Sequence, residues 1–189
     1  KREETLIIRD YASHPSVMRK EDPTWKFALG ASPITEGSIL RIVDEAGHEG
    51  FGYASATPHM GAIAATLEAE LEYFKPHVLG KDGDHIEAIG AALDRAMRGA
   101  PQAKAAVDCA LHEMLARRLN VPLCQLFGGQ IRDQVPILRI LAIKSPDEMA
   151  TQAKKLVDQG YRYLKIKVHG EVDLDVQRVA AIRKRVGDD

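Results

Sequence analysis

The chain has 189 residues, of which 45% are hydrophobic and 28% charged, and its formal net charge is −1. A chain of this length holds one large domain, or one domain and part of another, and its composition excludes a disordered polymer. The balanced charge gives no sign of nucleic acid or an anionic membrane as a partner, and apolar runs are too short for a membrane span. The two cysteines, Cys109 and Cys124, form no C-x-x-C pattern, so we expect a reduced, cytoplasmic setting.

The first 55 residues predict a small antiparallel sheet. The expected strands are residues 5–11, 38–44 and 50–55, with a long polar, proline-containing loop over residues 12–28. The turn residues between the second and third strands, which include Gly47, are typical of a hairpin.

Helices are expected next. The predicted ranges are 59–74, ending before Pro76; 84–97; an alanine-rich helix over 101–119; and a short helical turn over 122–127. Small side chains on the alanine-rich helix would allow it to pack closely against a neighbour.

The pattern changes at Gln134. The predicted elements are a strand over 135–143, a helix to residue 158 capped by Ser145 and Glu148, a strand over 161–169, and a helix over 172–186. The last helix has an apolar stripe of Val176, Val179, Ala180, Ile182 and Val186. The series strand, helix, strand, helix implies parallel strands. Two parallel strands do not form a stable layer alone, so the chain reads as cut within an α/β domain.

The strand over 161–169 carries two lysines on one side. Side chains in a strand alternate faces, so Lys165, Lys167 and His169 share a face and Leu164, Ile166 and Val168 take the other. If the lysine face is buried, burial and the neighbouring charge both favour a neutral amine, which can act as a base. If it faces solvent, the lysines simply protect the edge of a sheet from pairing.

Four segments resemble the mandelate racemase and muconate lactonizing enzyme branch of the enolase superfamily. They are the hairpin ITEGSILRIVDEAGHEGFGYAS, the helix and its exit AKAAVDCALHEMLARRLNVPLCQLFGG, the strand VPILRILAI, and the K-x-K segment LKIKVHG. Their order and spacing match over nearly the whole chain, which makes the set more specific than any one motif.

The resemblance implies a fold and a chemistry. Residues 1–130 would form an α+β capping domain, an antiparallel sheet plus helices, and residues 131–189 the first βα units of a TIM-type (β/α) barrel. The enzyme would bind Mg²⁺ and abstract a proton α to a carboxylate of a small substrate, giving a metal-stabilised enediolate. Lys167 would be the acid/base, and Lys165 would help to keep it neutral and balance charge near the carboxylate. Racemase or epimerase, cycloisomerase and acid-sugar dehydratase remain open.

Three further residues are candidates for substrate binding. In the resembled family, loops of the capping domain close over the barrel, and by position Trp25 and His59 would contact substrate. Packing of the loop onto the sheet explains Trp25 equally well, and His59 could simply begin a helix. His169 would lie near the barrel mouth, where a hydrogen-bonding or surface role is the alternative.

Other parts of the resembled site are expected elsewhere. The carboxylates that bind the metal and the base on the opposite face would lie beyond Asp189, since Asp188 and Asp189 read as a turn between helix and strand. We therefore expect the chain to be part of a longer enzyme, inactive alone, and to form a homo-oligomer as the resembled family commonly does. The alternative is a catalytically incomplete fragment that serves as a binding or assembly module.

Overall fold

The computed structural model describes residues 6–187. Thr5, the first residue of the first predicted strand, and Asp188 and Asp189, assigned above to a turn, lie outside the described residues. The chain divides into two compact units. Unit 1 comprises the residues up to Met18 together with Thr35–Ile131, and unit 2 comprises Arg19–Ile34 together with the residues from Arg132 onward. Each unit has a hydrophobic core of its own.

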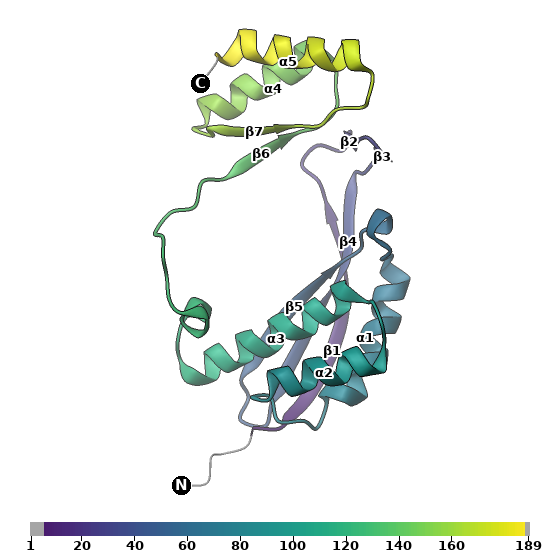
Figure 1. The fold of residues 1–189 in the computed structure, drawn as a ribbon, viewed down its shortest axis with the longest axis vertical. Coiled ribbons are helices and arrows are strands. Elements are labelled where there is room, and N and C mark those ends of the chain that lie inside the picture. The colour runs from purple at the N-terminus through teal and green to yellow at the C-terminus, as the bar shows by residue number, and fades with distance from the viewer. Residues whose placement is uncertain (1–5, 188–189) are drawn as a thin grey trace. The chain divides into compact units, whose positions relative to one another are not determined.

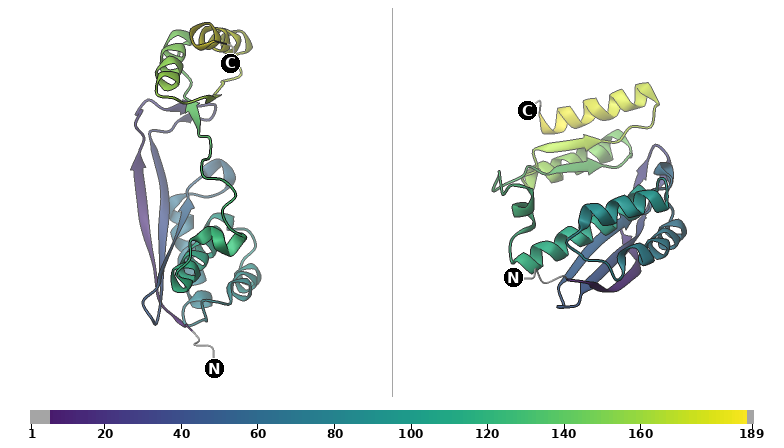
Figure 2. Two further views of the ribbon diagram at one scale, coloured as in Figure 1. Left: turned by 90° about the vertical axis from the view of Figure 1, so that its left-hand side faces the viewer. Right: turned by 60° about the horizontal axis from the view of Figure 1, so that its bottom comes forward.

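Unit 1 is built on a three-stranded sheet in the order β1 (Ile8–Arg19), β4 (Ile34–Asp44) and β5 (Glu49–Ser55). Helices α1 (Ala64–Val78), α2 (Ile86–Ala96) and α3 (Pro101–Leu119) cover one face of this sheet (Figure 1), and the side view shows them together on that face (Figure 2). Two short 3₁₀ helices, η1 (Pro58–Met60) and η2 (Leu123–Phe127), precede α1 and follow α3.

The predicted hairpin is confirmed. β4 and β5 pair antiparallel, with Arg41 opposite Phe51. The buried Asp44 carboxylate shapes the turn by accepting hydrogen bonds from the backbone N–H groups of Ala46 and His48, at 3.0 and 2.9 Å, and from the His48 ring. Gly47 takes a φ of 89°, a left-handed conformation that glycine adopts without strain.

The loop predicted over residues 12–28 is wrong in its first part, because β1 continues through to Arg19. Pro15 lies within that strand. Proline cannot donate a ladder hydrogen bond, but β1 is at the edge of the sheet, where one side of the strand needs no partner.

Helix α1 also differs from its prediction. It begins at Ala64, after η1, and runs past Pro76 to Val78. Pro76 lies in the last turn, where it removes a single helical hydrogen bond and the helix ends two residues later. The predicted bounds of α3 are confirmed, and α2 is confirmed over 86–96.

Close packing between α3 and β5 explains the glycines of the hairpin. A methyl group at Gly50 would overlap the carbonyl oxygen of Ala110, and one at Gly52 would overlap that of Ala106. Ala103, Ala106 and Ala110 are themselves fully buried. Small residues on both elements therefore let the helix backbone rest directly on the strand, as the alanine-rich sequence predicts.

Unit 2 contains two parallel strands, β6 (Leu138–Leu141) and β7 (Tyr163–Ile166), with helices α4 (Pro146–Asp158) and α5 (Val172–Val186). The parallel pairing is confirmed, although both strands are shorter than predicted. Both helices contribute to the core on one face of the strands, around Leu141, Met149 and Ile182. The predicted cap of α4 is confirmed, since Ser145 and Glu148 exchange side-chain and backbone hydrogen bonds. Unit 2 also includes the antiparallel pair β2 (Lys26–Phe27) and β3 (Gly30–Ala31).

The apolar stripe predicted on α5 is partly wrong. Ile182 is buried, but Val176 and Val179 are 61% and 41% exposed, whereas Arg178 is only 6% exposed. A charged side chain therefore occupies the inner face of this helix, where it binds Asp175 of α5 itself and the Lys144 carbonyl oxygen beyond the end of β6.

Candidate active site

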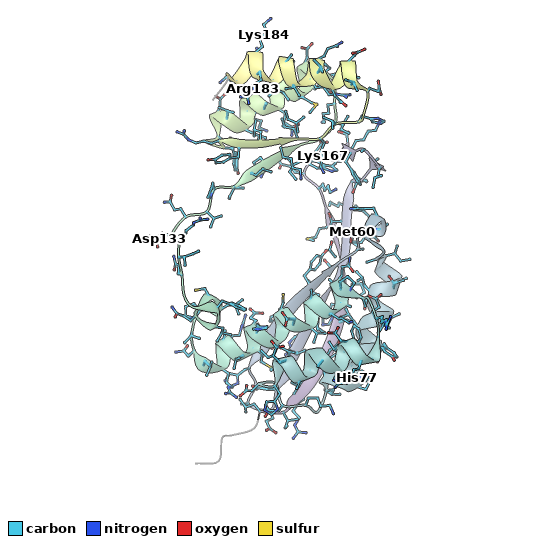
Figure 3. The ribbon with its side chains drawn as sticks, viewed as in Figure 1. Met60, His77, Asp133, Lys167, Arg183 and Lys184 are labelled. Atoms are coloured by element: carbon cyan, nitrogen blue, oxygen red, sulfur yellow. The ribbon has the colours of Figure 1, made fainter. Side chains whose placement is uncertain are left out.

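The lysines of the K-x-K motif lie at the carboxyl end of β7. Lys165 stands beside Ile140 of β6, and the backbone N–H of Lys167 donates to the Leu141 carbonyl oxygen at 3.2 Å. Leu164 and Ile166 pack on the core of α4 and α5. Since strand side chains alternate, Lys165 and Lys167 belong to the face turned away from the helices. Lys165 is exposed and Lys167 half-buried, and Figure 3 shows Lys167 where β7 enters the loop before α5.

Residues 19–34, here called the docking loop, are attached to the carboxyl end of β6. The backbone N–H of Ile143 donates to the Lys26 carbonyl oxygen at 3.1 Å. The Lys144 ammonium lies 2.8 Å from the Asp22 carboxylate, and the two side chains are only 25% and 22% exposed. Hydrogen bonds from Lys144 and Thr24 lower the pKa of Asp22 to about 2. A backbone contact and an ion pair therefore hold the loop at this edge.

Trp25 is fixed within the docking loop. Its backbone N–H donates to the Asp22 carbonyl oxygen at 3.1 Å, and its own carbonyl oxygen accepts from Ser32 at 2.9 Å. The Lys20 ammonium lies 5.1 Å from the centre of the indole ring and donates to the Ser32 hydroxyl at 2.9 Å. The indole is half-buried, and its contact with substrate stays a prediction.

A second ion pair fastens the loop that follows β7. The Asp175 carboxylate accepts hydrogen bonds from the backbone N–H groups of Gly170, at 2.9 Å, and His169, at 3.2 Å, and from the Arg178 guanidinium at 2.6 Å. Burial on its own would raise the pKa of Asp175, but these hydrogen bonds together outweigh it and lower that pKa. Arg178 also donates through Nε to the Lys144 carbonyl oxygen at 2.8 Å.

Asp22, Lys144, Asp175 and Arg178 were not among the residues predicted from sequence. One signal was present, since Arg178 is spaced four residues from both Leu174 and Ile182, within the apolar pattern of α5. A charged residue at such a position is rarely buried unless it is paired, and Asp175 precedes it by three residues, at the spacing of helix neighbours.

The two predicted histidines lie in different parts of the chain. His169 follows β7 by three residues, so it does not extend the strand as predicted, and its side chain is exposed. His59 belongs to unit 1, where it is exposed in η1. Both roles in substrate binding stay predictions.

An open groove of about 1000 Å³ runs along β6 and α4, with Trp25, Arg139 and Gln152 in its walls. Among residues 6–187, Lys165, Lys167 and His169 are not part of its lining. In the described part of the chain β6 pairs with β7 alone, so the groove follows a strand edge that is free to pair further. We therefore treat the lysine face and this groove as distinct features.

Metal binding finds no support in the described side chains. Within residues 6–187, no group of three or more His, Cys, Asp or Glu side chains is placed to hold a metal ion. The described residues thus do not fit a Mg²⁺ site. In the same part of the chain, no helix combines the length and hydrophobicity needed to cross a membrane.

Comparison with known proteins defines the class. Residues 13–128 match the model of the mandelate racemase / muconate lactonizing enzyme N-terminal domain, and residues 148–189 match the enolase C-terminal domain-like model. The chain therefore belongs to the mandelate racemase / muconate lactonizing enzyme family.

Its relatives include racemases, epimerases, cycloisomerases and a dehydratase. The chain is 34% identical to the L-Ala-D/L-Glu epimerase of Clostridium acetobutylicum over 96% of its own length and 51% of that protein. It is 33% identical to the N-succinyl-L-Arg/Lys racemase of Bacillus cereus, over 80% of this chain and 42% of that protein. The crystal structure of the Enterococcus faecalis dipeptide epimerase with Mg and the dipeptide L-Leu-L-Tyr matches with a TM-score of 0.92 at 32% identity, over 97% of this chain and 51% of that one. The chain spans about half the length of the relatives it matches.

Proposed function

We propose that this chain belongs to an enzyme that abstracts the proton α to a carboxylate, acting as a racemase or epimerase on N-acylated amino acids or dipeptides. The observation that carries the proposal is the placement of Lys165 and Lys167 on the face of β7 turned away from the helices, at the strand's carboxyl end. Active sites of α/β barrels gather at that end of the strands. The substrate class follows the relatives, which include a dipeptide epimerase and an N-succinyl-L-Arg/Lys racemase.

In this proposal Lys167 carries the proton. Its neutral amine takes the α-proton of the substrate at Nζ, leaving an enediolate, and an ammonium returns a proton to the same carbon. Lys165, two residues earlier on the same face, assists by adding positive charge beside the developing negative charge of the carboxylate. Inversion also needs a proton donor on the opposite face of the carbon, which the proposal assigns to residues outside those described.

The wider assembly is proposed on the same grounds. β6, α4, β7 and α5 would be the first units of a (β/α) barrel, and unit 1 would cap it. Mg²⁺, present with a dipeptide in the Enterococcus faecalis structure, would stabilise negative charge on the substrate carboxylate. Since the described side chains hold no metal site, its ligands would come from elsewhere in the enzyme. Trp25, His59 and His169 would contact the substrate, and the enzyme would be a homo-oligomer.

Proton exchange tests the proposal directly. The complete gene product is incubated in deuterated water with N-succinyl amino acids and dipeptides, and loss of the α-proton signal is followed by NMR. Lys167→Met should abolish exchange, while Lys184→Met, at an exposed position on α5 (Figure 3), should leave it unchanged. Exchange at the wild-type rate in the Lys167 variant would rule out the role given to that residue.

A further inference from the structure

A continuous chain of polar contacts links the docking loop to the backbone that follows Lys167. Asp22 pairs with the Lys144 ammonium, and the Lys144 carbonyl oxygen accepts from Arg178. Arg178 in turn binds Asp175, which holds the backbone N–H groups of His169 and Gly170. The contacts at each step are 2.6–3.2 Å long. Three segments far apart in sequence are thus joined through charged groups.

Asp175 and Arg178 form the least solvent-exposed pair in this series of contacts. The two side chains are 13% and 8% exposed, so solvent competes weakly for their hydrogen bonds. A planar guanidinium can serve two acceptors in fixed directions, which a lysine ammonium on a flexible stem does less well. Arg178 uses this geometry to bind a carboxylate with Nη1 and a carbonyl oxygen with Nε.

We infer that Asp175 and Arg178 are positioning residues for Lys167 and that, through Lys144, they couple this position to the docking loop. The inference rests on the proposed function, since it concerns the same lysine. Asp175 fixes the backbone two and three residues after Lys167, and the ladder bond from Lys167 to Leu141 fixes it on the other side. A shift of the docking loop would displace Lys144. Because Arg178 binds the Lys144 carbonyl oxygen, the displacement would also move Arg178 and the loop that carries His169.

Hydrogen exchange tests the first half without relying on catalysis. In the complete gene product, Asp175→Asn should speed exchange at the His169 and Gly170 amides by at least about tenfold, the scale expected for losing charge-assisted hydrogen bonds. Asp173→Asn is the matched control, because Asp173 lies in the same first turn of α5 and is exposed. Equal protection in Asp175→Asn and wild type would overturn the positioning role.

Kinetics test the second half. Arg178→Lys keeps a charge beside Asp175 but lacks the rigid planar group that serves both acceptors, so kcat for α-proton exchange should fall while KM changes little. Arg178→Met should lower kcat further, and partial rescue by lysine separates positioning from loss of folding. Asp22→Asn and Arg178→Lys should be non-additive in kcat/KM by more than about threefold, beyond the scatter of independent sites. Additive effects would overturn the coupling.

Lys144→Met separates the two arms of the network. It removes the ion pair with Asp22 but keeps the backbone carbonyl that Arg178 binds. Exchange at His169 and Gly170 should quicken, but less than in Asp175→Asn, because Asp175 keeps its own contacts while the docking loop loosens. Exchange at both amides at the wild-type rate would overturn the coupling through Lys144. These readouts remain interpretable if Lys167→Met retains activity, so failure of the proposed function is distinguishable from failure of the inference.

Discussion

Gly52 of β5 lies against the carbonyl oxygen of Ala106 in α3, at a separation that leaves no room for a side chain. Gly52→Ala should therefore push α3 off the sheet and destabilise unit 1 by about 1–3 kcal/mol, the cost of overpacking a tight core. Hydrogen exchange at the slowest amides of β4 and β5 reports the stability of unit 1 alone, and it should become faster in this variant.

The same substitution elsewhere provides the control. Gly90 is exposed in the middle of α2, and a methyl group there would meet no atom within 4 Å. Gly90→Ala should stabilise the helix by about 0.5–1 kcal/mol, because alanine has the higher helix propensity. Destabilisation by both variants would show that close approach to α3 is not the cause.

Acid should release the docking loop. The pKa of Asp22 is lowered from its ordinary value of 3.8 to about 2, chiefly by the hydrogen bond from Lys144. Because the pKa of Asp22 is lower in the folded protein than in the unfolded chain, its ionised carboxylate stabilises the loop at pH values above about 4. This stabilisation is lost as the pH falls from about 4 through about 2. Trp25 is the only tryptophan of the 189-residue chain and lies in the loop, so its fluorescence should follow that transition.

Asp22→Asn should show at neutral pH the Trp25 fluorescence that the wild-type protein shows only at low pH, when the loop is released. The far-ultraviolet circular dichroism should be unchanged. Glu21→Gln is the control, since Glu21 is largely exposed and lies 3.9 Å from Arg139, at the limit of an ion pair. A normal tryptophan signal in the Asp22 variant would contradict the role of the ion pair.

The turn between β4 and β5 should depend strongly on Asp44. Its buried carboxylate accepts from two backbone N–H groups and the His48 ring, so Asp44→Ala would remove all three hydrogen bonds from the turn. We expect a loss of about 2–3 kcal/mol in unit 1 stability. Glu45→Ala, which breaks the exposed pair with Arg9, should cost well under about 1 kcal/mol. Amide exchange at β4 and β5 compares the two, and similar costs would contradict the buried role of Asp44.

The two lysines should differ in their effect on exchange of the substrate α-proton. Lys167→Arg replaces the amine with a guanidinium, which does not lose its proton in proteins, so exchange should fall to background. Lys165→Arg keeps the charge that Lys165 is proposed to supply, so part of the activity should remain. The measurement is deuterium incorporation by the complete gene product, and equal loss in both variants would contradict the division of roles.

Local signals in the sequence predicted the helices well where capping and composition agreed. The bounds of α3 and α5 follow from Pro101 and Gly187, and the start of α4 from the cap formed by Ser145 and Glu148. β1 was missed because Pro15 and the polar residues around it resemble a loop, and only the edge position of the strand makes them compatible with a sheet. Edge position is a tertiary property that a local pattern does not contain.

The candidate site was predictable only in part. Alternation along β7 placed Lys165 and Lys167 on one face, and the core contacts of Leu164 and Ile166 agree with it. The contacts of Arg178 were not predictable in the same way. One partner, Asp175, lies one turn away on α5, but the other, the Lys144 carbonyl oxygen, lies beyond the end of β6. The stripe predicted with Val176 and Val179 assumed that only apolar residues face inward. The contacts between the docking loop and the end of β6 join residues more than 100 positions apart, and a local sequence pattern does not contain such contacts.

The docking loop belongs to unit 2, whereas most of β1 before it and of β4 after it belongs to unit 1. The chain therefore passes between the units three times, near residues 18, 34 and 131. Gene shuffling between relatives at a single breakpoint near residue 131 would join Asp22 from one parent to Lys144 from another. Hybrids that inherit residues 19–34 and 132–189 from the same parent keep these partners together. Library design in this family should therefore treat the two segments as one heritable block.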